Sequence, residues 1–191
     1  AARPQPLMRD IPDLPLLTPR LTLGPLTSDD AEVMFAYRGD RSVGRFQGWT
    51  PRSVKEVRQF IERQDIGNLH EPRAWTQLGL YLTTSGQLVG DLGIHTLDGP
   101  RQAELGITLS PARQGQGLAT EAWRRALRYL LDECGRHRVI ASVDPRNAAI
   151  VRLLERVGMR REAHFRQSLW FKEAWVDDVI YARLRDEGRR S

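Results

Sequence analysis

Residues 113–122 read RQGQGLATEA, and this stretch decides the fold of the chain. An apolar run typical of a strand precedes it, and a long run with helical spacing follows it. The first turn of a helix carries backbone N–H groups without partners inside the helix, and the helix dipole adds roughly half a positive charge there. Gly115 and Gly117 lack a Cβ, so a phosphate can approach the backbone closely. The stretch therefore predicts a strand-to-helix turn that binds a pyrophosphate.

The residues of this turn that are expected to contact a phosphate form one continuous run. They are Arg113, Gln114, Gly115, Gln116, Gly117, Leu118, Ala119 and Thr120. A glycine-rich turn without any ligand is the plainer explanation of the glycines alone. Two other phosphate loops fit less well, because a mononucleotide loop needs a lysine after its last glycine and a dinucleotide loop needs three glycines.

The sequence on either side of this turn alternates between strand and helix patterns. Strands are expected over residues 20–26, 75–83, 88–95, 103–109, 139–143, 162–171 and 176–184. Helices are expected over residues 28–37, 53–64, 119–131 and 148–157, whereas residues 41–51 and 65–73 have the composition of a turn and a loop. Short connections join the strands between residues 75 and 109, which predicts an antiparallel meander. The order as a whole predicts a mixed α/β fold.

Length and composition indicate one globular domain, since the chain has 191 residues and 40% of them are hydrophobic. The expected boundaries are a loose lead-in over residues 1–16, the domain over 17–185 and a tail over 186–191. Cys134 is the single cysteine, so no internal disulfide can form, and a cytoplasmic location is expected. No apolar run approaches the roughly 18 residues that a membrane span needs.

Basic residues outnumber acidic ones, and the formal net charge is +5. Such a surface can attract nucleic acid, an anionic cofactor or an acidic partner. Acidic and basic residues are well mixed along the chain, which disfavours a nucleic-acid-binding protein. The pattern does not indicate a metal site, and it leaves open whether the chain forms a homodimer.

In several segments the sequence resembles the GNAT superfamily of N-acetyltransferases, and within it the RimJ/RimL branch. The cofactor pattern of this superfamily is Gln or Arg, two residues, Gly, one residue, then Gly or Ala, and residues 114–119 match it. The match extends over residues 17–185. Four further segments look like parts of that branch, namely Arg20-Leu21-Thr22-Leu23 with Asp30-Ala31, Ala103-Glu104-Leu105-Gly106-Ile107, Asn147 through Gly158-Met159, and Trp175-Val176-Asp177-Asp178.

The resemblance implies a mostly antiparallel central sheet with helices on both faces, splayed between its fourth and fifth strands. On this sequence those strands are residues 103–109 and 139–143, with acetyl-CoA wedged between them as cosubstrate. The resemblance places the pantetheine arm against the backbone near Leu109 and against the side chain of Asn147. Arg152 or Arg146 is expected to meet the nucleotide phosphates, although a solvated helix face also explains these arginines.

The resemblance also implies transfer of an acetyl group to a primary amine, either a peptide N-terminus or a small molecule. Two departures from the family pattern concern the proton donor to the leaving CoA thiolate. Ile150 stands where RimJ/RimL-type enzymes often have serine, and Leu154 stands where other GNAT enzymes have tyrosine. Neither side chain can donate a proton, which keeps a non-catalytic CoA-binding module as the alternative function.

Acyl transfer to an amine needs a base, because an alkyl ammonium group has a pKa near 10. Alternate residues of a strand share a face, so each of the three meander strands has one apolar and one polar face. If the polar faces coincide, a cluster of four side chains forms beside the cleft, although a half-exposed sheet gives the same alternation. These four are Tyr81, Asp91, His95 and Glu104. Glu104 is the expected general base, since GNAT enzymes often use a strand carboxylate there, and His95 is the second candidate.

Three further side chains have alternative explanations. Cys134 could suggest a nucleophile, but it lies late on the long helix without a positioned base, so packing is its expected role. Trp49 and Trp175 fall in expected loops, where they either line the entrance for the acceptor or pack against their neighbours.

Overall fold

The computed structural model describes residues 14–97 and 101–189. The lead-in predicted over residues 1–16 lies outside this range as far as residue 13, and Leu16 already belongs to the sheet. Of the tail predicted over residues 186–191, the described part continues a 3-10 helix, Arg185–Arg189. No helix in the described part of the chain is long and apolar enough to cross a bilayer.

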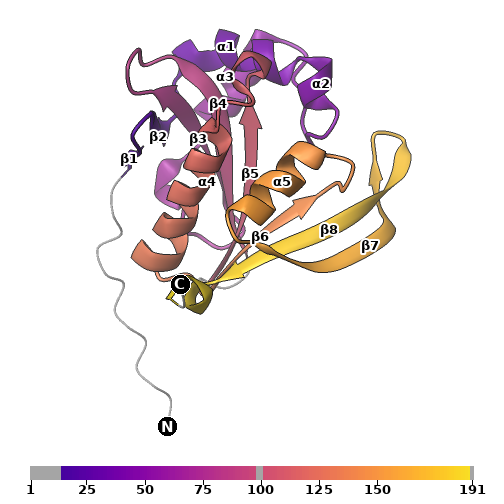
Figure 1. Cartoon of the computed structure of the whole chain (residues 1–191). Coiled ribbons are helices and arrows are strands. Elements are labelled where there is room, and N and C mark those ends of the chain that lie inside the picture. The colour runs from indigo at the N-terminus through magenta and orange to yellow at the C-terminus, as the bar shows by residue number, and fades with distance from the viewer. Residues whose placement is uncertain (1–13, 98–100, 190–191) are drawn as a thin grey trace.

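Within the described residues, the strands form one sheet of eight in the order β1-β2-β3-β4-β5-β6-β8-β7 (Figure 1). The strands are β1 (Leu16–Leu17), β2 (Leu21–Pro25), β3 (Trp75–Leu82), β4 (Leu88–Thr96), β5 (Gln102–Leu109), β6 (Arg138–Val143), β7 (Arg160–Phe171) and β8 (Ala174–Leu184). The helices are α1 (Ala31–Arg38), α2 (Arg41–Gly44), α3 (Val54–Glu62), α4 (Leu118–Arg128) and α5 (Ala148–Arg156). The mixed fold and the antiparallel meander of β3, β4 and β5 are as predicted.

One strand pair differs from all the others in the described sheet, because β5 and β6 run parallel. They pair only where Gln102–Glu104 lies beside Arg138–Ile140. Beyond this point β5 continues to Leu109 and β6 to Val143, and the two strands separate (Figure 1). These are the strands that the sequence predicted as the fourth and fifth, so the expected splay is present.

The helices cover both faces of the sheet, as the family resemblance predicted. Leu92 of β4 is fully buried in the main core, which α4 and α5 complete on one face. Asp91, its neighbour in sequence, points to the opposite face and is hydrogen-bonded by α1. A second, smaller core joins α1 to α3 on that side through Met34, Val57 and Ile61.

The sequence pattern missed one α-helix and one strand of the described residues. Residues 41–51 were expected to be a turn, but α2 forms there because Asp40 caps it, accepting hydrogen bonds from the backbone N–H groups of Ser42 and Val43 at 2.8 and 3.4 Å. Strand β1 has only two residues, too few for an alternating pattern to show. The long predicted helix is present as α4, which continues into a π-helical turn over Tyr129–Glu133.

The last hairpin, β7 with β8, forms one edge of the sheet. Most side chains of β7 are exposed, and its register with β8 shifts at two places, near Arg161 and after Phe165. The hairpin turn is tied to the N-terminal half of the chain, since the Lys172 ammonium donates to the Gly44 carbonyl and lies 3.3 Å from the Thr50 hydroxyl.

A buried ionic network attaches α1 to the sheet. Asp91 is fully buried and accepts hydrogen bonds from Tyr37 Oη at 2.6 Å, from Arg38 Nε at 3.0 Å and from the Gln77 amide. Burial disfavours the charged form of Arg38, but the negative charge of Asp91 favours it more strongly, so the pKa of Arg38 is raised. Burial and then Asp91 raise the pKa of Tyr37. Asp91 is thus part of the packing of α1.

Asp91→Ala is expected to lower the free energy of unfolding by about 3–5 kcal/mol, because Arg38 is left buried without its counter-charge. The measurement is the midpoint of urea-induced unfolding, compared between proteins whose unfolding free energy falls with urea concentration at the same slope. Arg160→Ala is the control, since its bridge to Glu187 spans 3.4 Å and Arg160 is mostly exposed, so a loss under about 1 kcal/mol is expected. Equal losses in the two variants would contradict this account of the network.

Candidate functional site

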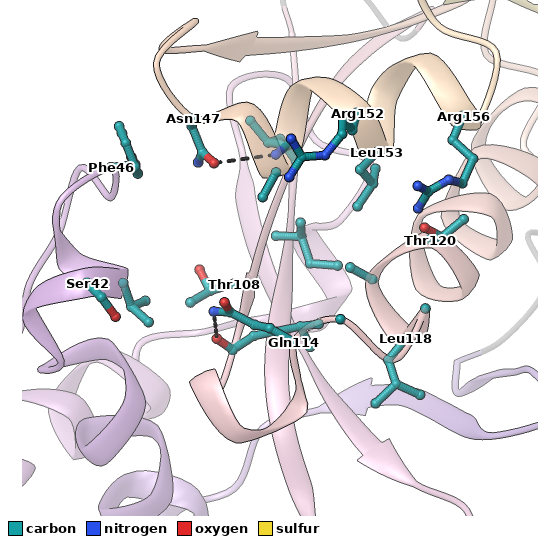
Figure 2. A pocket seen from close by; sticks show the side chains of 18 of the residues that line it. Ser42, Phe46, Thr108, Gln114, Leu118, Thr120, Asn147, Arg152, Leu153 and Arg156 are labelled. Carbon is teal, nitrogen blue, oxygen red and sulfur yellow. Dashed lines mark hydrogen bonds between the residues drawn. The ribbon is translucent and has the colours of Figure 1, made fainter.

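A cavity of about 550 Å³ lies where β5 and β6 separate. Its walls come from three parts of the chain: α2 with the residues after it, the end of β5 with the turn into α4, and α5 (Figure 2). Ser42 and Phe46 stand at one end of the cavity, and Thr120 and Arg156 at the other. The predicted phosphate turn therefore faces the gap that the splayed strands leave.

Two glycines shape the turn that leads into α4. Gly115 has φ +74° and Gly117 has φ +79°, a backbone conformation that L side chains rarely adopt. Gly117 is the N-cap of α4, and since it has no side chain, it cannot occupy the N–H groups of the first turn. Leu118, Ala119 and Thr120 of that turn line the cavity. The turn thus presents backbone donors and the positive end of the helix dipole to whatever fills the cavity.

A distant arginine holds this turn in place. Arg20 donates from Nη1 to the Gln116 carbonyl at 2.9 Å and pairs through Nε with Glu121 at 2.6 Å. Glu121 also accepts from Thr18 Oγ1 at 2.6 Å. Burial works against ionisation of Glu121, but these hydrogen bonds outweigh it and lower its pKa. A Cβ on Gly117 would lie 3.5 Å from Arg20 Nη2, so the guanidinium adds positive charge beside the turn.

Most of the residues predicted to hold the cofactor line the cavity. These are Leu109, Gln114, Gly115, Gly117, Leu118, Ala119, Thr120, Asn147 and Arg152. Two point elsewhere: Arg113 donates to Gln87 Oε1 at 2.9 Å, and Gln116 donates to the Ala112 carbonyl at 3.0 Å. The Gln114 amide donates to the Leu109 carbonyl at 3.1 Å, so it covers the end of the open edge of β5 (Figure 2).

Helix α5 supplies the opposite wall. Asn147 caps it, with Oδ1 accepting from the Ile150 backbone N–H at 3.4 Å, which leaves the amide N–H₂ group as a donor at the cavity. Arg152 and Arg156 line the cavity from the same helix, four residues apart (Figure 2). Arg146 pairs instead with Asp144, at 3.0 Å from its Nε. Of the two arginines predicted for the phosphates, the structure thus places Arg152 at the cavity.

The sequence analysis missed Arg156, although its spacing from Arg152 is a signal that could have indicated it. It also missed Arg20, which lies 96 positions before its partner Gln116 and gives no local signal. The two positions without a proton donor differ in their surroundings: Ile150 lines the cavity, whereas Leu154 is fully buried in the core.

A groove of about 480 Å³ continues from the turn between α4 and residues 17–20. It shares Gly117, Thr120 and Arg156 with the first cavity. Its lining is rich in guanidinium groups, from Arg20, Arg124, Arg125, Arg128 and Arg156. Glu121 and Glu133 neutralise part of this charge through Arg20 and Arg125. The groove still concentrates positive charge next to the phosphate turn.

The predicted polar cluster divides into separate groups. Asp91 is enclosed under α1, and Tyr81 donates to Asp30 Oδ2 at 2.7 Å, so neither joins a catalytic group. Burial, followed by Asp30, raises the pKa of Tyr81. The prediction of one cluster of four is therefore wrong, because the covering helix α1 and the segment before it supply closer partners for two of its members.

His95 and Glu104 do lie together. His95 Nδ1 is 3.3 Å from Glu104 Oε2, and both side chains are partly exposed, at 28% and 22%. Glu104 is the last residue of β5 that pairs with β6, opposite Ile140. The pair therefore stands at the closed end of the gap, and the lining of the cavity begins three residues further along β5, at Ile107.

The remaining candidates are explained by packing or by exposure. Burial raises the pKa of the Cys134 thiol, which disfavours the nucleophilic thiolate. Trp49 stacks on Phe60 with ring centres 4.5 Å apart and so packs inside the α1–α3 unit. Trp175 is exposed on the hairpin. Across residues 14–97 and 101–189, no group of three or more His, Cys, Asp or Glu side chains is placed to hold a metal ion.

The sequence and the fold of this chain are similar to those of known acetyltransferases. Residues 20–160 match the family described as an acetyltransferase (GNAT) domain. The uncharacterized N-acetyltransferase YnaD of Bacillus subtilis (strain 168) is 25% identical over 172 residues, which cover 90% of this chain and 98% of YnaD. The structure of a GNAT-family acetyltransferase from Bacillus anthracis has a TM-score of 0.82 and 26% identity, covering 91% of this chain and 99% of that one.

A further solved structure carries a ligand. Mycobacterium smegmatis RimJ, in complex with CoA-disulfide, has a TM-score of 0.78 and 23% identity, covering 90% of this chain and 85% of that one. At this identity the likeness concerns the fold alone.

Gly117→Val is expected to weaken acetyl-CoA binding by about tenfold or more, because a branched Cβ takes the space that a phosphate needs at the helix N-terminus. Isothermal titration calorimetry measures the loss. Gly86→Val is the matched control: Gly86 has φ +68° with open space around it, in the turn between β3 and β4, so this variant carries the same backbone strain away from the cavity. Equal affinity in the parent and in Gly117→Val would remove the phosphate turn from the site.

Proposed function

Because the chain belongs to the GNAT acetyltransferase family, we propose that it binds acetyl-CoA in the gap between β5 and β6 and delivers the acetyl group on the side of α2. Membership makes the chain an N-acetyltransferase, which moves an acetyl group to a primary amine. The observation that carries the proposed binding mode is the turn at Gly115–Gly117, where a helix N-terminus without a side-chain cap faces the cavity.

The charges around the cavity support one orientation of acetyl-CoA. Its diphosphate fits the N-terminus of α4, and its nucleotide end, which carries several negative charges, fits the side where Arg152, Arg156 and the arginine-lined groove lie. The pantetheine arm then follows the open edge of β5 towards Ile107, with the Asn147 amide as a donor on the other side. This orientation directs the thioester to the end of the cavity where Ser42 and Phe46 stand (Figure 2).

Transfer requires an amine that has lost its extra proton. A base first removes the extra proton of the ammonium group. The amine nitrogen then attacks the thioester carbonyl carbon, the C–S bond breaks, and the second nitrogen-bound proton passes to water or to the departing thiolate. Glu104 is the proposed base, with His95 hydrogen-bonded to it at 3.3 Å. Since Glu104 lies just beyond the lining of the cavity, a short chain of water molecules carries the proton.

The departing thiolate receives no proton from position 150 or 154. Ile150 at the cavity wall and Leu154 in the core are both apolar. A thiol has a pKa near 8.5, so the thiolate is a competent leaving group near neutral pH, and water or the departing ammonium proton can neutralise it. These two residues are therefore compatible with turnover.

Mixing the purified protein with acetyl-CoA and a panel of amines is expected to release free thiol with at least one acceptor class. The panel contains peptides with free N-termini, polyamines and aminoglycosides, and the thiol is followed with a colorimetric reagent. The matching N-acetylated peptides are the controls, since they lack the amine. If acetyl-CoA binds but no amine in the panel stimulates thiol release, the non-catalytic module becomes the better account.

Glu104→Gln is expected to lower kcat about 100-fold at saturating amine, because the amide keeps the shape of the side chain but cannot accept the proton. The KM for acetyl-CoA is expected to change little, since Glu104 lies away from the phosphate turn. His95→Gln is the companion variant, with a smaller loss expected from an altered partner of the base. If Glu104→Gln is as fast as the parent and His95→Gln is slow, the roles are reversed.

A further inference from the structure

Trp75 is an exposed tryptophan whose position the proposed mechanism does not explain. It begins β3, it is 46% exposed, and its partner across the strands is His95 of β4. His95 in turn lies opposite Glu104 of β5. The indole, the imidazole and the carboxylate therefore form one row across three strands, on the face of the sheet that also carries Asp91.

Two glycines make room for the indole to lie on the sheet. A Cβ on Gly93 would come within 2.9 Å of Trp75 Nε1 and 3.0 Å of its Cζ2, which is closer than real Cβ contacts allow without a shift. A Cβ on Gly106 would lie 3.9 Å from the same Cζ2 atom. The ring thus extends from β3 over Gly93 of β4 to Gly106 of β5, and a larger residue at position 93 would force the ring or its neighbours to shift.

A hydrogen-bond chain from the protein interior fixes the direction of this exposed ring. Trp75 Nε1 donates to Gln77 Oε1 at 3.0 Å, and Gln77 is itself buried and donates to Asp91. Asp91 is held by Arg38. The His95 ring lies against the indole as well, with ring centres 4.9 Å apart. The indole is therefore pre-positioned at low entropic cost to any group that binds on it.

The end of the ring lies near Glu104, the proposed base. Gly106 follows Glu104 by two residues and precedes Ile107, the first residue of β5 in the cavity wall. The ring edge is therefore next to the closed end of the gap between β5 and β6. An aromatic ring beside a carboxylate is a combination that attracts an ammonium group, through the electron-rich ring face and through the opposite charge.

We propose that Trp75 is an acceptor-binding residue, on whose indole the ammonium group of the acceptor rests beside Glu104 before it loses its proton. This inference rests on the proposed function and adds a specificity to it: acceptors that arrive as compact, accessible cations are favoured over neutral amines of the same size. Gln77 is then a positioning residue, since it acts through the indole.

The test compares Trp75→Phe, which keeps an aromatic face, with Trp75→Leu, which keeps an apolar side chain without one. At saturating acetyl-CoA and with the best amine of the thiol-release panel, Trp75→Leu is expected to raise the KM for the amine roughly 3- to 30-fold, with kcat within about twofold of the parent. Trp75→Phe is expected to stay within about threefold of the parent KM. Trp175→Leu, which removes a tryptophan that is 60% exposed on β8, is the control and is expected to leave both constants unchanged.

A second measurement does not depend on turnover. Tetramethylammonium, a cation that cannot be acetylated, is titrated into the parent and into both Trp75 variants while the backbone amide chemical shifts of β3, β4 and β5, which all three proteins share, are followed. Weaker binding in Trp75→Leu than in Trp75→Phe supports the site, whether or not any amine releases thiol. The absence of thiol release would overturn the proposed function but not this site. Equal tetramethylammonium affinity in all three proteins, an unchanged amine KM in Trp75→Leu, or a parallel loss of acetyl-CoA affinity overturns the inference.

Discussion

The short parallel pairing of β5 with β6 is the constraint on which the whole site depends. Three residues of each strand are joined, and the strands then part, so the backbone of β5 from Gly106 to Leu109 has no neighbouring strand on that side. Backbone groups in such an edge need partners, and a protein rarely leaves them buried and unpaired. Gln114 satisfies the Leu109 carbonyl at the far end, and Ile107 and Thr108 line the cavity. An amide-rich pantetheine arm is the kind of ligand that completes such an edge.

The two faces of the sheet have different roles. On the apolar face, α4 and α5 pack against the meander, and the start of each helix lies at the cavity. On the polar face, Asp91 anchors α1, and through Gln77 the same network reaches an indole at the surface. One buried carboxylate therefore serves both the packing of a helix and the geometry of a surface that faces the gap. A substitution at this carboxylate would therefore lower the stability of the protein and alter the geometry of the site together.

The local features of this arrangement could be predicted from the sequence, and the contacts between distant segments could not. The turn at residues 113–120, the meander and the helix after Asn147 are each written in a continuous stretch, by glycine placement or by hydrophobic period, and all were predicted. The guanidinium of Arg20 beside the turn could not be predicted, because its partner lies in another strand-to-helix unit. The burial of Asp91 was missed for a related reason: alternation shows which residues share a face, but the helix that covers part of that face comes from elsewhere in the chain. The short helix α2 depended on one cap, Asp40, in a stretch without periodicity.

The outer edge of the sheet has a consequence for how the protein behaves among its own copies. A long strand with a free edge is a template on which a second chain can add a strand, and β7 carries apolar side chains such as Phe165 and Trp170 in the open. Its two register shifts interrupt the regular row of backbone donors and acceptors that such a template needs. Arg160 and Arg161 add charge to the same strand. The irregular pairing of the hairpin thus opposes the addition of further strands from other copies of the chain.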